Sequence, residues 1–379
     1  CVNNTYFKIR GGQMLYIDIK KHLKNFTLDI TLETDNNRVG ILGKSGSGKS
    51  MMLKAIAGII KPDEGIIVLN DRVLFDSKKK INLQPRERNI GYLFQNYALF
   101  PHMTVRENIF SGMIRASKYE KQKMSSDMIK RLCLNGLENR YPKELSGGQQ
   151  QRVAIARMLA TKPEILMFDE PFSALDYHLR EHMQENLLEI LSEESTTSLL
   201  VSHDIDEAYR LSKEIVVVDD GQIKRQDRKE KVFNEPKNIA TAKITGCKNI
   251  SRARKIANDK VFAMDWGVEV KILPTKDEVD YIGIRAHHIE YSKTLEENTY
   301  AYTIESSSET RFGQTMYFSL GKEHSEKKNQ LRFEADKKLL ETEFFEENFK
   351  YVKLIYLFSK YKSEINRFKV ILKENVCYG

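Results

Sequence analysis

One eight-residue loop constrains the fold of this chain more than any other feature. The run Gly43-Lys44-Ser45-Gly46-Ser47-Gly48-Lys49-Ser50 fits the pattern G-x-x-x-x-G-K-[ST]. It follows the apolar run Val39–Leu42, which is typical of a strand, and it precedes a helical pattern. Gly46 and Gly48 permit a tight backbone path that turns several N–H groups toward one anion, and the helix dipole adds positive potential. The loop therefore predicts a strand–loop–helix unit that cradles phosphate groups.

A phosphate cradle also needs a metal site and a group that activates water. We expect Lys49 to reach the β- and γ-phosphates of a nucleotide and the Ser50 hydroxyl to bind Mg²⁺. Asp169 and Glu170 follow the apolar run Ile165–Phe168, and the carboxyl end of such a buried strand should lie beside the cradle. We expect Asp169 to hold Mg²⁺, directly or through water, and Glu170 to act as the general base.

His203 follows a third apolar run, Ser198–Val201, so it should meet the same nucleotide and hydrogen-bond to the γ-phosphate. These runs alternate with helical patterns at 149–160 and 175–191. Such alternation predicts an α/β fold with a mainly parallel sheet covered by helices. The dipeptide Asp220-Gly221 predicts a hairpin that closes this first domain.

The pattern breaks at Asn234-Glu235-Pro236, which divides the chain into a nucleotide-binding domain at 1–235 and a second domain at 236–379. Short alternating segments follow the break, and polar turns separate them, which predicts a small all-β domain, a barrel. These segments are 268–272, 281–285, 300–304 and 315–320.

Composition excludes several classes of function. The 379 residues include 61 Lys and Arg against 53 Asp and Glu, and the net charge of +8 is spread evenly along the chain, so we expect no nucleic-acid partner. No apolar run approaches the roughly 20 residues of a membrane helix, and the polar N-terminus lacks a signal-peptide pattern. We therefore expect a cytoplasmic location, with Met14 as an alternative native start. The four widely spaced cysteines suit a reducing compartment and predict no zinc site.

The remaining motifs resemble one family. The run Leu145-Ser146-Gly147-Gly148-Gln149-Gln150-Gln151-Arg152 resembles the signature of ABC-transporter ATPases. With the cradle, Asp169-Glu170, Ser173-Ala174-Leu175-Asp176, His203 and Gln95, it reproduces the family's order across the first domain. The signature precedes a helix that begins near Gln149, so a hydroxyl and several backbone N–H groups form a second anion site there.

The resemblance implies how these motifs work together. Two cassettes dock head to tail as a homodimer, and Ser146, Gly147, Gly148 and Gln149 of one clamp the γ-phosphate that the other holds. The loop Ser173, Ala174, Leu175 and Asp176 communicates across this seam. Gln95 approaches Mg²⁺ and the attacking water. The helical subdomain that follows, at about 96–160, receives the transmembrane permease through Phe100–Met103.

The resemblance also implies ATP as the nucleotide and Mg²⁺ as its metal, held by Ser50, Gln95 and Asp169. Adenine would stack on Phe26 or on Tyr16, although core packing explains either aromatic residue equally well. The expected ATP-binding residues are Phe26, Gly43, Lys44, Ser45, Gly46, Ser47, Gly48, Lys49, Ser50 and Met51.

The second domain resembles the oligonucleotide-binding-like regulatory domain of importer ATPases through Gly283–Ile289. The stretches Thr245–Ile250 and Arg86–Ile90 look most like molybdate-type subunits. The expected solute is therefore molybdate or tungstate, with sulfate, ferric iron, a polyamine or a sugar as alternatives. Such a subunit lies on the cytoplasmic face of the membrane and works with a permease and, indirectly, an extracellular solute-binding protein. Adjacent His287 and His288 should point to opposite faces of a strand, which argues against a metal site.

Two other classes of function compete with an importer ATPase. Soluble ABC ATPases that act on nucleic acid or ribosomes tend to carry two cassettes or a long insertion, whereas only a short span separates Gln95 from Ser146. A regulatory nucleotide-binding module without hydrolysis would lack a base such as Glu170, which is present. We therefore expect an ATP-hydrolysing subunit that energises solute uptake.

Overall fold

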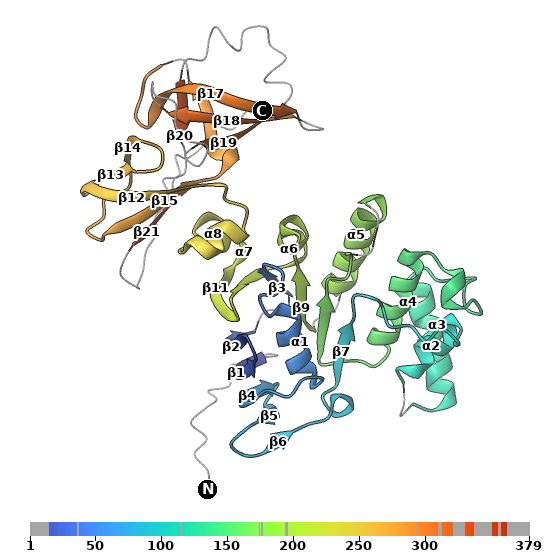
Figure 1. Ribbon diagram of the computed structural model, residues 1–379. Coiled ribbons are helices and arrows are strands. Elements are labelled where there is room, and N and C mark those ends of the chain that lie inside the picture. The colour runs from blue at the N-terminus through green and yellow to red at the C-terminus, as the bar shows by residue number, and fades with distance from the viewer. Residues whose placement is uncertain are drawn as a thin grey trace. The chain divides into compact units, whose positions relative to one another are not determined.

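The computed structural model (Figure 1) describes residues 15–35, 38–113, 116–173, 175, 177–193, 196–292, 294–309, 313–320, 330–336, 351–354 and 358–361. Backbone contacts divide the chain into two units, Cys1–Lys229 and Glu230–Gly379. The break that the sequence shows at residues 234–236 lies slightly beyond this division. The difference arises at helix α7 (Lys229–Asn234), because its Phe233 carbonyl accepts a 2.6 Å hydrogen bond from Arg285 of the second unit.

The first unit is built on one sheet, and its described strands lie in the order β6-β5-β4-β1-β2-β11-β10-β3-β9-β8-β7. The strands are β1 (Leu15–Leu23), β2 (Phe26–Thr34), β3 (Arg38–Gly43), β4 (Glu64–Leu69), β5 (Arg72–Asp76), β6 (Ile81–Asn82), β7 (Ile90–Leu93), β8 (Ile165–Asp169), β9 (Thr197–Ser202), β10 (Glu214–Asp219) and β11 (Gln222–Arg228). The helices are α1 (Lys49–Ala57), α2 (Val105–Ser111), α3 (Lys118–Arg131), α4 (Gly147–Leu159), α5 (Tyr177–Glu193) and α6 (Ile205–Leu211), with 3₁₀ turns η1 (Pro85–Glu87) and η2 (Pro142–Glu144).

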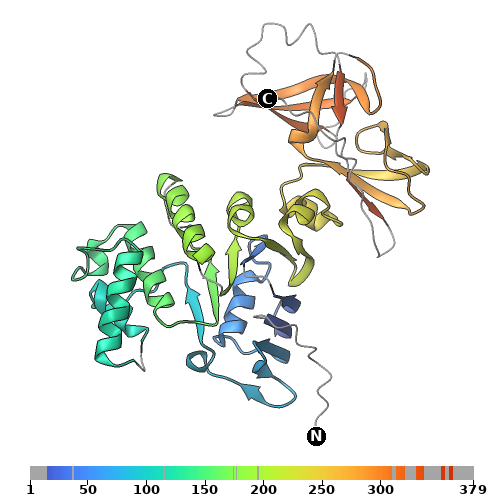
Figure 2. The ribbon, with the colours of Figure 1, turned by 180° about the vertical axis from the view of Figure 1, so that it is seen from behind.

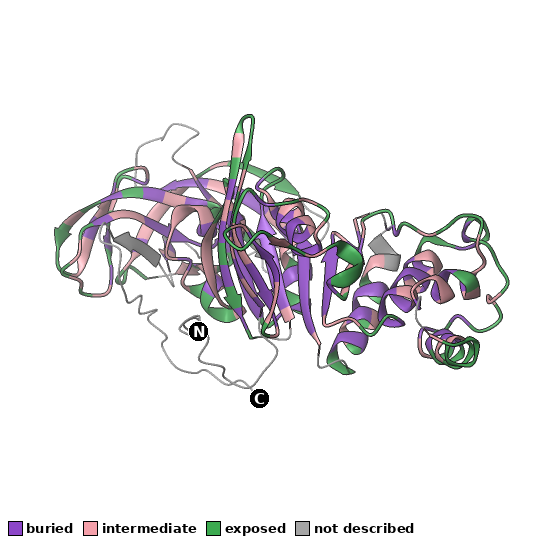
Figure 3. Cartoon of the chain, turned by 90° about the horizontal axis from the view of Figure 1, so that it is seen from below, coloured by how far each residue is buried: buried purple, intermediate pink, exposed green. Residues whose placement is uncertain are grey.

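The centre of this sheet is parallel, because β10, β3, β9, β8 and β7 pair in parallel register. Every residue of β8 and β9 is buried, as expected for parallel strands with helices on both faces. Figure 3 draws these buried residues in purple. Parallel strands end at the same edge of a sheet, so the residues after β3, β7, β8 and β9 gather there. The cradle, Gln95, Glu170 and His203 all follow these strands.

Helices α2, α3 and α4 lie together beside the β7 end of the sheet (Figure 2). Each begins at a capping box, in which the N-cap side chain accepts from the N3 amide and the N3 side chain accepts from the N-cap amide. The N-cap residues are Thr104, Ser117 and Ser146. All three helices lie within the span 96–160 that the sequence assigns to a helical subdomain.

A two-residue turn closes the first unit. Asp220 and Gly221 have φ angles of 49° and 71° between antiparallel β10 and β11, the backbone that a type I′ hairpin turn requires. A Cβ at Gly221 would also lie 2.0 Å from the Thr27 carbonyl oxygen, so only glycine fits. The hairpin predicted from the sequence is therefore confirmed.

The second unit contains two antiparallel sheets, whose described strands lie in the orders β14-β13-β12-β15-β21 and β16-β20-β17-β18-β19. Both sheets contribute to one apolar core, which includes Val261, Ile282 and Phe318. The elements are α8 (Ile239–Ile244), β12 (Asn249–Ala257), β13 (Lys260–Ala263), β14 (Val268–Lys271), β15 (Val279–Ile284), η3 (Ala286–His288), β16 (Ile289–Ser292), β17 (Thr299–Glu309), β18 (Gly313–Leu320), β19 (Leu331–Asp336), β20 (Tyr351–Leu354) and β21 (Phe358–Tyr361).

The all-β character of this unit agrees with the sequence prediction, and its described strands form two sheets around one shared core. The 3₁₀ turn η3 separates β15 of the first sheet from β16 of the second. The same turn corrects the placement of His287 and His288. They lie in η3 rather than on a strand, and their rings meet edge to face with centroids 4.4 Å apart.

Candidate active site

The cradle lies between β3 and α1, as the sequence predicts. Gly48 has a φ of 103°, and a Cβ there would lie 2.6 Å from the Leu28 side chain, so this position requires glycine. Lys49 is 5% exposed, and its ammonium donates to the carbonyl oxygens of Gly43 and Lys44, each at 2.8 Å. The loop therefore curls around the Lys49 side chain and holds its charge at the centre of the cradle.

The surroundings of Lys49 balance two electrostatic effects. Burial lowers the pKa of Lys49, whereas the nearby carboxylates of Glu170 and Asp169 act to raise it. Ser47 in the same loop is buried, and its hydroxyl has no hydrogen-bond partner among the described residues. Lys44 is exposed and forms a 3.2 Å ion pair with Asp219 at the end of β10. The cradle thus combines a buried ammonium, a buried hydroxyl without a partner among the described residues, and an exposed lysine.

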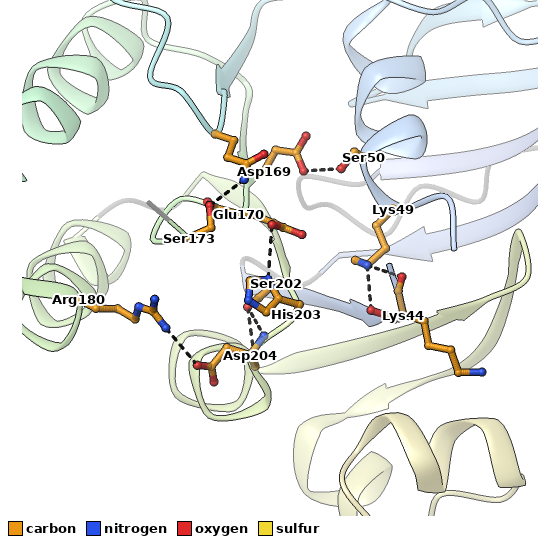
Figure 4. A network of polar contacts seen from close by, with 12 residues as sticks. Lys44, Lys49, Ser50, Asp169, Glu170, Ser173, Arg180, Ser202, His203 and Asp204 are labelled. Carbon is orange, nitrogen blue, oxygen red and sulfur yellow. Dashed lines mark hydrogen bonds and ion pairs between the residues drawn. The ribbon is translucent and has the colours of Figure 1, made fainter. Parts of the chain in front are cut away.

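The predicted metal ligands Ser50 and Asp169 are in direct contact. The Ser50 hydroxyl donates to Asp169 Oδ1 at 2.7 Å, and Asp169 is only 8% exposed (Figure 4). A hydroxyl and a carboxylate at this spacing supply the hard oxygen donors that Mg²⁺ prefers, so the residues fit the predicted metal.

Tyr92 of β7 is a site residue that the sequence analysis missed. Its hydroxyl donates to Asp169 Oδ2 at 2.9 Å, so both carboxylate oxygens of Asp169 accept hydrogen bonds. Burial raises the pKa of Tyr92, and the Asp169 carboxylate raises it further, so Tyr92 stays a proton donor. A tyrosine in a strand carries no local signal for this role, which depends on the pairing of β7 with β8.

Gln95 follows β7 and lies on the same edge, but its described contact is with Ser173. Gln95 Nε2 donates to Ser173 Oγ at 3.1 Å, and Ser173 Oγ donates to the Glu170 carbonyl oxygen at 2.9 Å. Gln95 is therefore linked to the backbone of Glu170 through one hydroxyl. This arrangement places Gln95 next to the predicted base rather than directly on Asp169.

Glu170 and His203 face each other. His203 Nδ1 lies 3.4 Å from Glu170 Oε2, and the side chains are 58% and 26% exposed (Figure 4). Glu170 adopts a left-handed φ of 50°, and its N–H donates to Val201 on β9 at 3.0 Å. A left-handed glutamate is unusual and persists where the surrounding structure fixes it. The carboxylate is thus aimed into the space beside the cradle with an imidazole next to it.

The turn that carries His203 is held by its neighbours. Asp204 caps α6 by accepting from the amides of Asp206 and Glu207, and its other oxygen lies 3.9 Å from Arg180 of α5. The Ser202 hydroxyl accepts from the Asp204 amide at 2.9 Å. These contacts fix the backbone on the C-terminal side of His203.

The predicted signature forms the first turn of α4. Ser146 Oγ accepts from the Gln149 amide at 3.3 Å, and Gln149 Oε1 accepts from the Ser146 amide at 2.9 Å. Gly147 and Gly148 are the first two residues of this 13-residue helix. In the adjacent predicted loop, Ser173 and Leu175 are described, with Leu175 buried, whereas Ala174 and Asp176 lie outside the described residues.

The two candidate adenine-stacking residues lie at opposite ends of the β1–β2 hairpin. Phe26 begins β2, and a Cβ added at Gly48 would lie 3.0 Å from the Phe26 ring, so the ring borders the cradle. Tyr16 lies near the start of β1, opposite Glu33. Met51, also predicted to bind ATP, packs in part against the apolar core.

The described residues contain no cluster of three or more His, Cys, Asp or Glu that could hold a metal ion. Among the part of the chain that the structure describes, no helix is long and apolar enough to cross a membrane. Of the four cysteines, Cys133 is exposed, Cys247 is buried, and Cys1 and Cys377 lie outside the described residues. Met14, the alternative native start, also lies outside them.

The fold and this site together define a P-loop nucleotide-binding cassette followed by a β-rich unit. A family model described as ABC transporter matches residues 23–173. The spermidine/putrescine import ATP-binding protein of Nitratidesulfovibrio vulgaris is 38% identical over 270 residues, which cover 69% of this chain and 72% of that protein. The chain therefore belongs to the ABC transporter ATP-binding proteins, and the fold class and the ATPase class predicted from the sequence are confirmed.

Other relatives carry different solute names. The sulfate/thiosulfate import ATP-binding protein of Synechocystis sp. is 42% identical over 224 residues, covering 58% of this chain and 61% of that protein. The molybdenum import ATP-binding protein of Haemophilus influenzae is 41% identical over 224 residues, covering 59% and 63%. The match thus spans slightly less than two thirds of these two relatives. The solved structure of cbiO1 from Clostridium perfringens, part of the ABC transporter complex cbiONQ, has a TM-score of 0.52 and 27% identity, covering 59% of this chain and 91% of that chain.

Proposed function

We propose that this chain binds ATP in the cradle and hydrolyses it with Glu170 as the general base. The observation that carries this proposal is the meeting of three groups at one sheet edge: the Lys49 ammonium, the Ser50–Asp169 pair, and the Glu170 carboxylate beside His203. Lys49 would bind the β- and γ-phosphates, and Ser50 and Asp169 would hold Mg²⁺, which neutralises phosphate charge. Glu170 would accept a proton from the attacking water, and His203 would hydrogen-bond to the γ-phosphate.

Two substitutions in one helix separate phosphate binding from general charge effects. Lys49→Ala should abolish measurable ATP binding in calorimetry, because it removes the cradle ammonium. Lys54→Ala, in the last turn of the same helix α1, should leave ATP affinity unchanged. Equal affinities for the two variants would contradict the assignment of Lys49. Glu170→Gln should bind ATP as tightly as the wild type, because it keeps the shape of the side chain.

The first turn of α4 supports a homodimer of cassettes. Ser146 and the amides that follow it form an anion site at a helix N-terminus, which is not needed by the cradle of its own chain. We expect this turn to contact the γ-phosphate held by a second copy. Glu170→Gln with Mg-ATP should therefore elute as a dimer in size-exclusion chromatography, and adding Ser146→Arg should return it to a monomer. If the variant that carries both Glu170→Gln and Ser146→Arg still elutes as a dimer with Mg-ATP, this arrangement is contradicted.

A cleft beside the helical subdomain supports docking of a transmembrane permease. It has a volume of about 520 Å³, and its lining includes Ile59, Phe94, Phe100 and Arg157. Ile59 and Phe100 are 46% and 41% exposed, and exposed apolar residues around a cleft favour a protein partner. Docking there would hold the chain at the cytoplasmic face of the membrane as a peripheral subunit.

Crosslinking tests the docking site directly. A cysteine at Leu99 or Met103 should crosslink to the co-expressed permease, whereas a cysteine at exposed Lys24, in the β1–β2 turn, should not. A crosslink at Lys24, with none at Leu99 or Met103, would contradict the assignment of the permease site to this cleft.

We propose an oxyanion, molybdate or tungstate, as the imported solute, with sulfate as the second candidate. The relatives are named for sulfate/thiosulfate, molybdenum and spermidine/putrescine, so their names do not select one solute. The charges around one pocket of this chain favour one class of solute. A pocket of about 400 Å³ in the second unit is lined by Lys243 and Lys248, and by Arg252, which is paired with Asp265 at 2.6 Å. Its excess of positive charge favours an anion over a polyamine.

Two measurements test the solute class. Calorimetry on the full chain should show heat of binding for molybdate but none for spermidine, and Lys248→Gln should weaken the molybdate signal, whereas exposed Lys276→Gln should not. The partner solute-binding protein should rank molybdate and tungstate above sulfate. Selection of a polyamine, a sugar or ferric ion by that protein would overturn the solute assignment and leave the ATPase proposal standing.

A further inference from the structure

The segment between Gln95 and the docking cleft contains an unfavourable backbone kink. Tyr97 and Ala98 have φ angles of 59° and 44°, so two consecutive residues with a Cβ lie in the left-handed region. Non-glycine residues seldom adopt this conformation, and they keep it only where surrounding contacts fix the backbone. Tyr97 is buried, and its ring belongs to the core of the helical subdomain.

Arg157 of α4 supplies the contacts that fix this kink. Arg157 Nη1 donates to the Ala98 carbonyl oxygen at 2.8 Å, and Nη2 donates to that of Tyr97 at 3.0 Å. The planar fork of a guanidinium suits two adjacent carbonyls, which a lysine ammonium cannot bridge in the same way. The guanidinium also lies 5.4 Å from the centroid of the Phe100 ring. One partly buried side chain therefore contacts both carbonyls of the kink and the exposed ring that follows.

Asn108 of α2 holds the other side of the same segment. Asn108 is fully buried, and its Oδ1 accepts from the Phe100 amide at 2.9 Å. Its Nδ2 donates to the carbonyl oxygens of Phe100 at 3.1 Å and Met103 at 2.9 Å. The segment 97–103 is thus fixed to two helices by side chains rather than by a backbone ladder.

We propose that Arg157 is a positioning residue for ATP hydrolysis. By holding the kink at Tyr97 and Ala98, it keeps Gln95 against Ser173, which in turn binds the Glu170 carbonyl oxygen. Arg157 also lies against the Phe100 ring, which lines the docking cleft. A movement of that ring would therefore displace Arg157 and, through the kink, shift Gln95. This inference rests on the proposed function of the site and assigns a residue that touches neither nucleotide nor metal.

Arg152 provides a matched control on the same helix. Its Nη1 donates to the carbonyl oxygens of Leu132 and Cys133 at 3.3 and 3.2 Å, and Cys133 also has a left-handed φ, of 52°. Arg152 thus makes a similar grip on a kinked turn, but at the end of α3 rather than on the segment after Gln95. If Arg157 only stabilises the helical subdomain, removing either arginine should change hydrogen exchange at residues 97–103 to a similar extent.

The test compares Arg157→Ala, Arg157→Lys and Arg152→Ala in the full chain. We expect both Arg157 variants to lower kcat for phosphate release by about tenfold or more, because a small misplacement of a positioned group slows chemistry. KM for ATP should stay within about twofold, because the cradle is untouched. Methylguanidinium should restore much of the kcat of Arg157→Ala, since Arg157 lines an open cleft. Because Arg152 belongs to the signature run, its variant is compared by hydrogen exchange at residues 97–103 and not by kcat.

A second readout does not depend on activity. Hydrogen exchange at the backbone amides of residues 97–103, other than Pro101, should accelerate in the Arg157 variants and stay unchanged in Arg152→Ala. Wild-type kcat and exchange in Arg157→Ala would overturn the inference. So would an equal acceleration of exchange at residues 97–103 in Arg152→Ala, or a loss of kcat in Arg157→Ala that methylguanidinium does not restore. If the wild-type chain releases no phosphate at all, the proposed function fails instead, and the exchange measurement still decides whether Arg157 holds the segment.

Discussion

Glu207 offers a quantitative test of how the turn behind His203 is built. This α6 residue is 5% exposed, and its Oε1 has no hydrogen-bond partner among the described residues. Burial, followed by repulsion from Asp204, raises the pKa of Glu207 from 4.5 to about 8, while the Ser202 hydrogen bond and Arg180 oppose the rise. The folded chain therefore keeps a proton on Glu207 at pH values where the unfolded chain has lost it.

The sign and size of the effect follow from this difference. Between pH 4.5 and about 8 the folded state binds more protons than the unfolded state, so the free energy of unfolding falls as pH rises through this interval. At about 1.4 kcal/mol per pH unit, the full interval corresponds to a loss on the order of 5 kcal/mol. Glu207→Gln keeps the size of the side chain and cannot ionise. The variant should match the wild type near pH 4.5 and exceed its stability by several kcal/mol near pH 8.

Urea unfolding followed by far-UV circular dichroism measures this difference, because the long helices lie in the first unit. The free energy of unfolding should be compared between Glu207→Gln and the wild type across the same pH range. Glu185→Gln, an exposed position on α5, is the control and should show no pH-dependent difference. A stability difference for Glu207→Gln that stays flat with pH would refute the account of a buried, protonated carboxyl.

Two further substitutions test other parts of the first unit. Tyr92→Phe removes the hydrogen bond to Asp169 Oδ2. The Mg²⁺ concentration for half-maximal hydrolysis should rise by about tenfold, because hydrogen-bond partners that orient metal ligands strengthen metal binding. An unchanged Mg²⁺ titration would show that Tyr92 does not have this role. Gly221→Ala should lower the free energy of unfolding of the first unit in urea by about 1–3 kcal/mol, since its Cβ would meet the Thr27 carbonyl. Gly136→Ala, where φ is 80° but the space around the residue is open, should lower this free energy by less. Equal losses for the two variants would contradict the steric argument.

The sequence predicts well which residues gather at the carboxyl edge of the parallel strands, because its motifs are local. The cradle, Asp169 and His203 each follow a buried apolar run, and the parallel pairing of those runs brings them together by geometry alone. The sequence also predicts a helix that begins near Gln149, and the structure starts this helix slightly earlier, at Gly147, with Ser146 as its N-cap. These features depend on a few neighbouring residues and on one rule of sheet topology.

The residues that the sequence analysis missed depend on tertiary contacts. Tyr92 and Arg157 contact groups far along the chain, so neither spacing nor periodicity marks them. The sequence predicts a strand at His287 and His288, yet the chain turns there at η3, between β15 of one sheet and β16 of the other. Such turns are decided by how the two sheets share one core, which a single sequence does not display.

Phosphate release from Mg-ATP by the purified full chain, measured beside Glu170→Gln, tests the central claim most directly. The wild-type chain should release phosphate steadily, and release should stop when EDTA removes Mg²⁺. Glu170→Gln should retain ATP with unchanged affinity while its turnover falls by several orders of magnitude, because the base that activates water is lost. Wild-type turnover in Glu170→Gln would contradict the assignment of the base, and a wild-type chain that binds Mg-ATP without releasing phosphate would contradict the proposed hydrolysis.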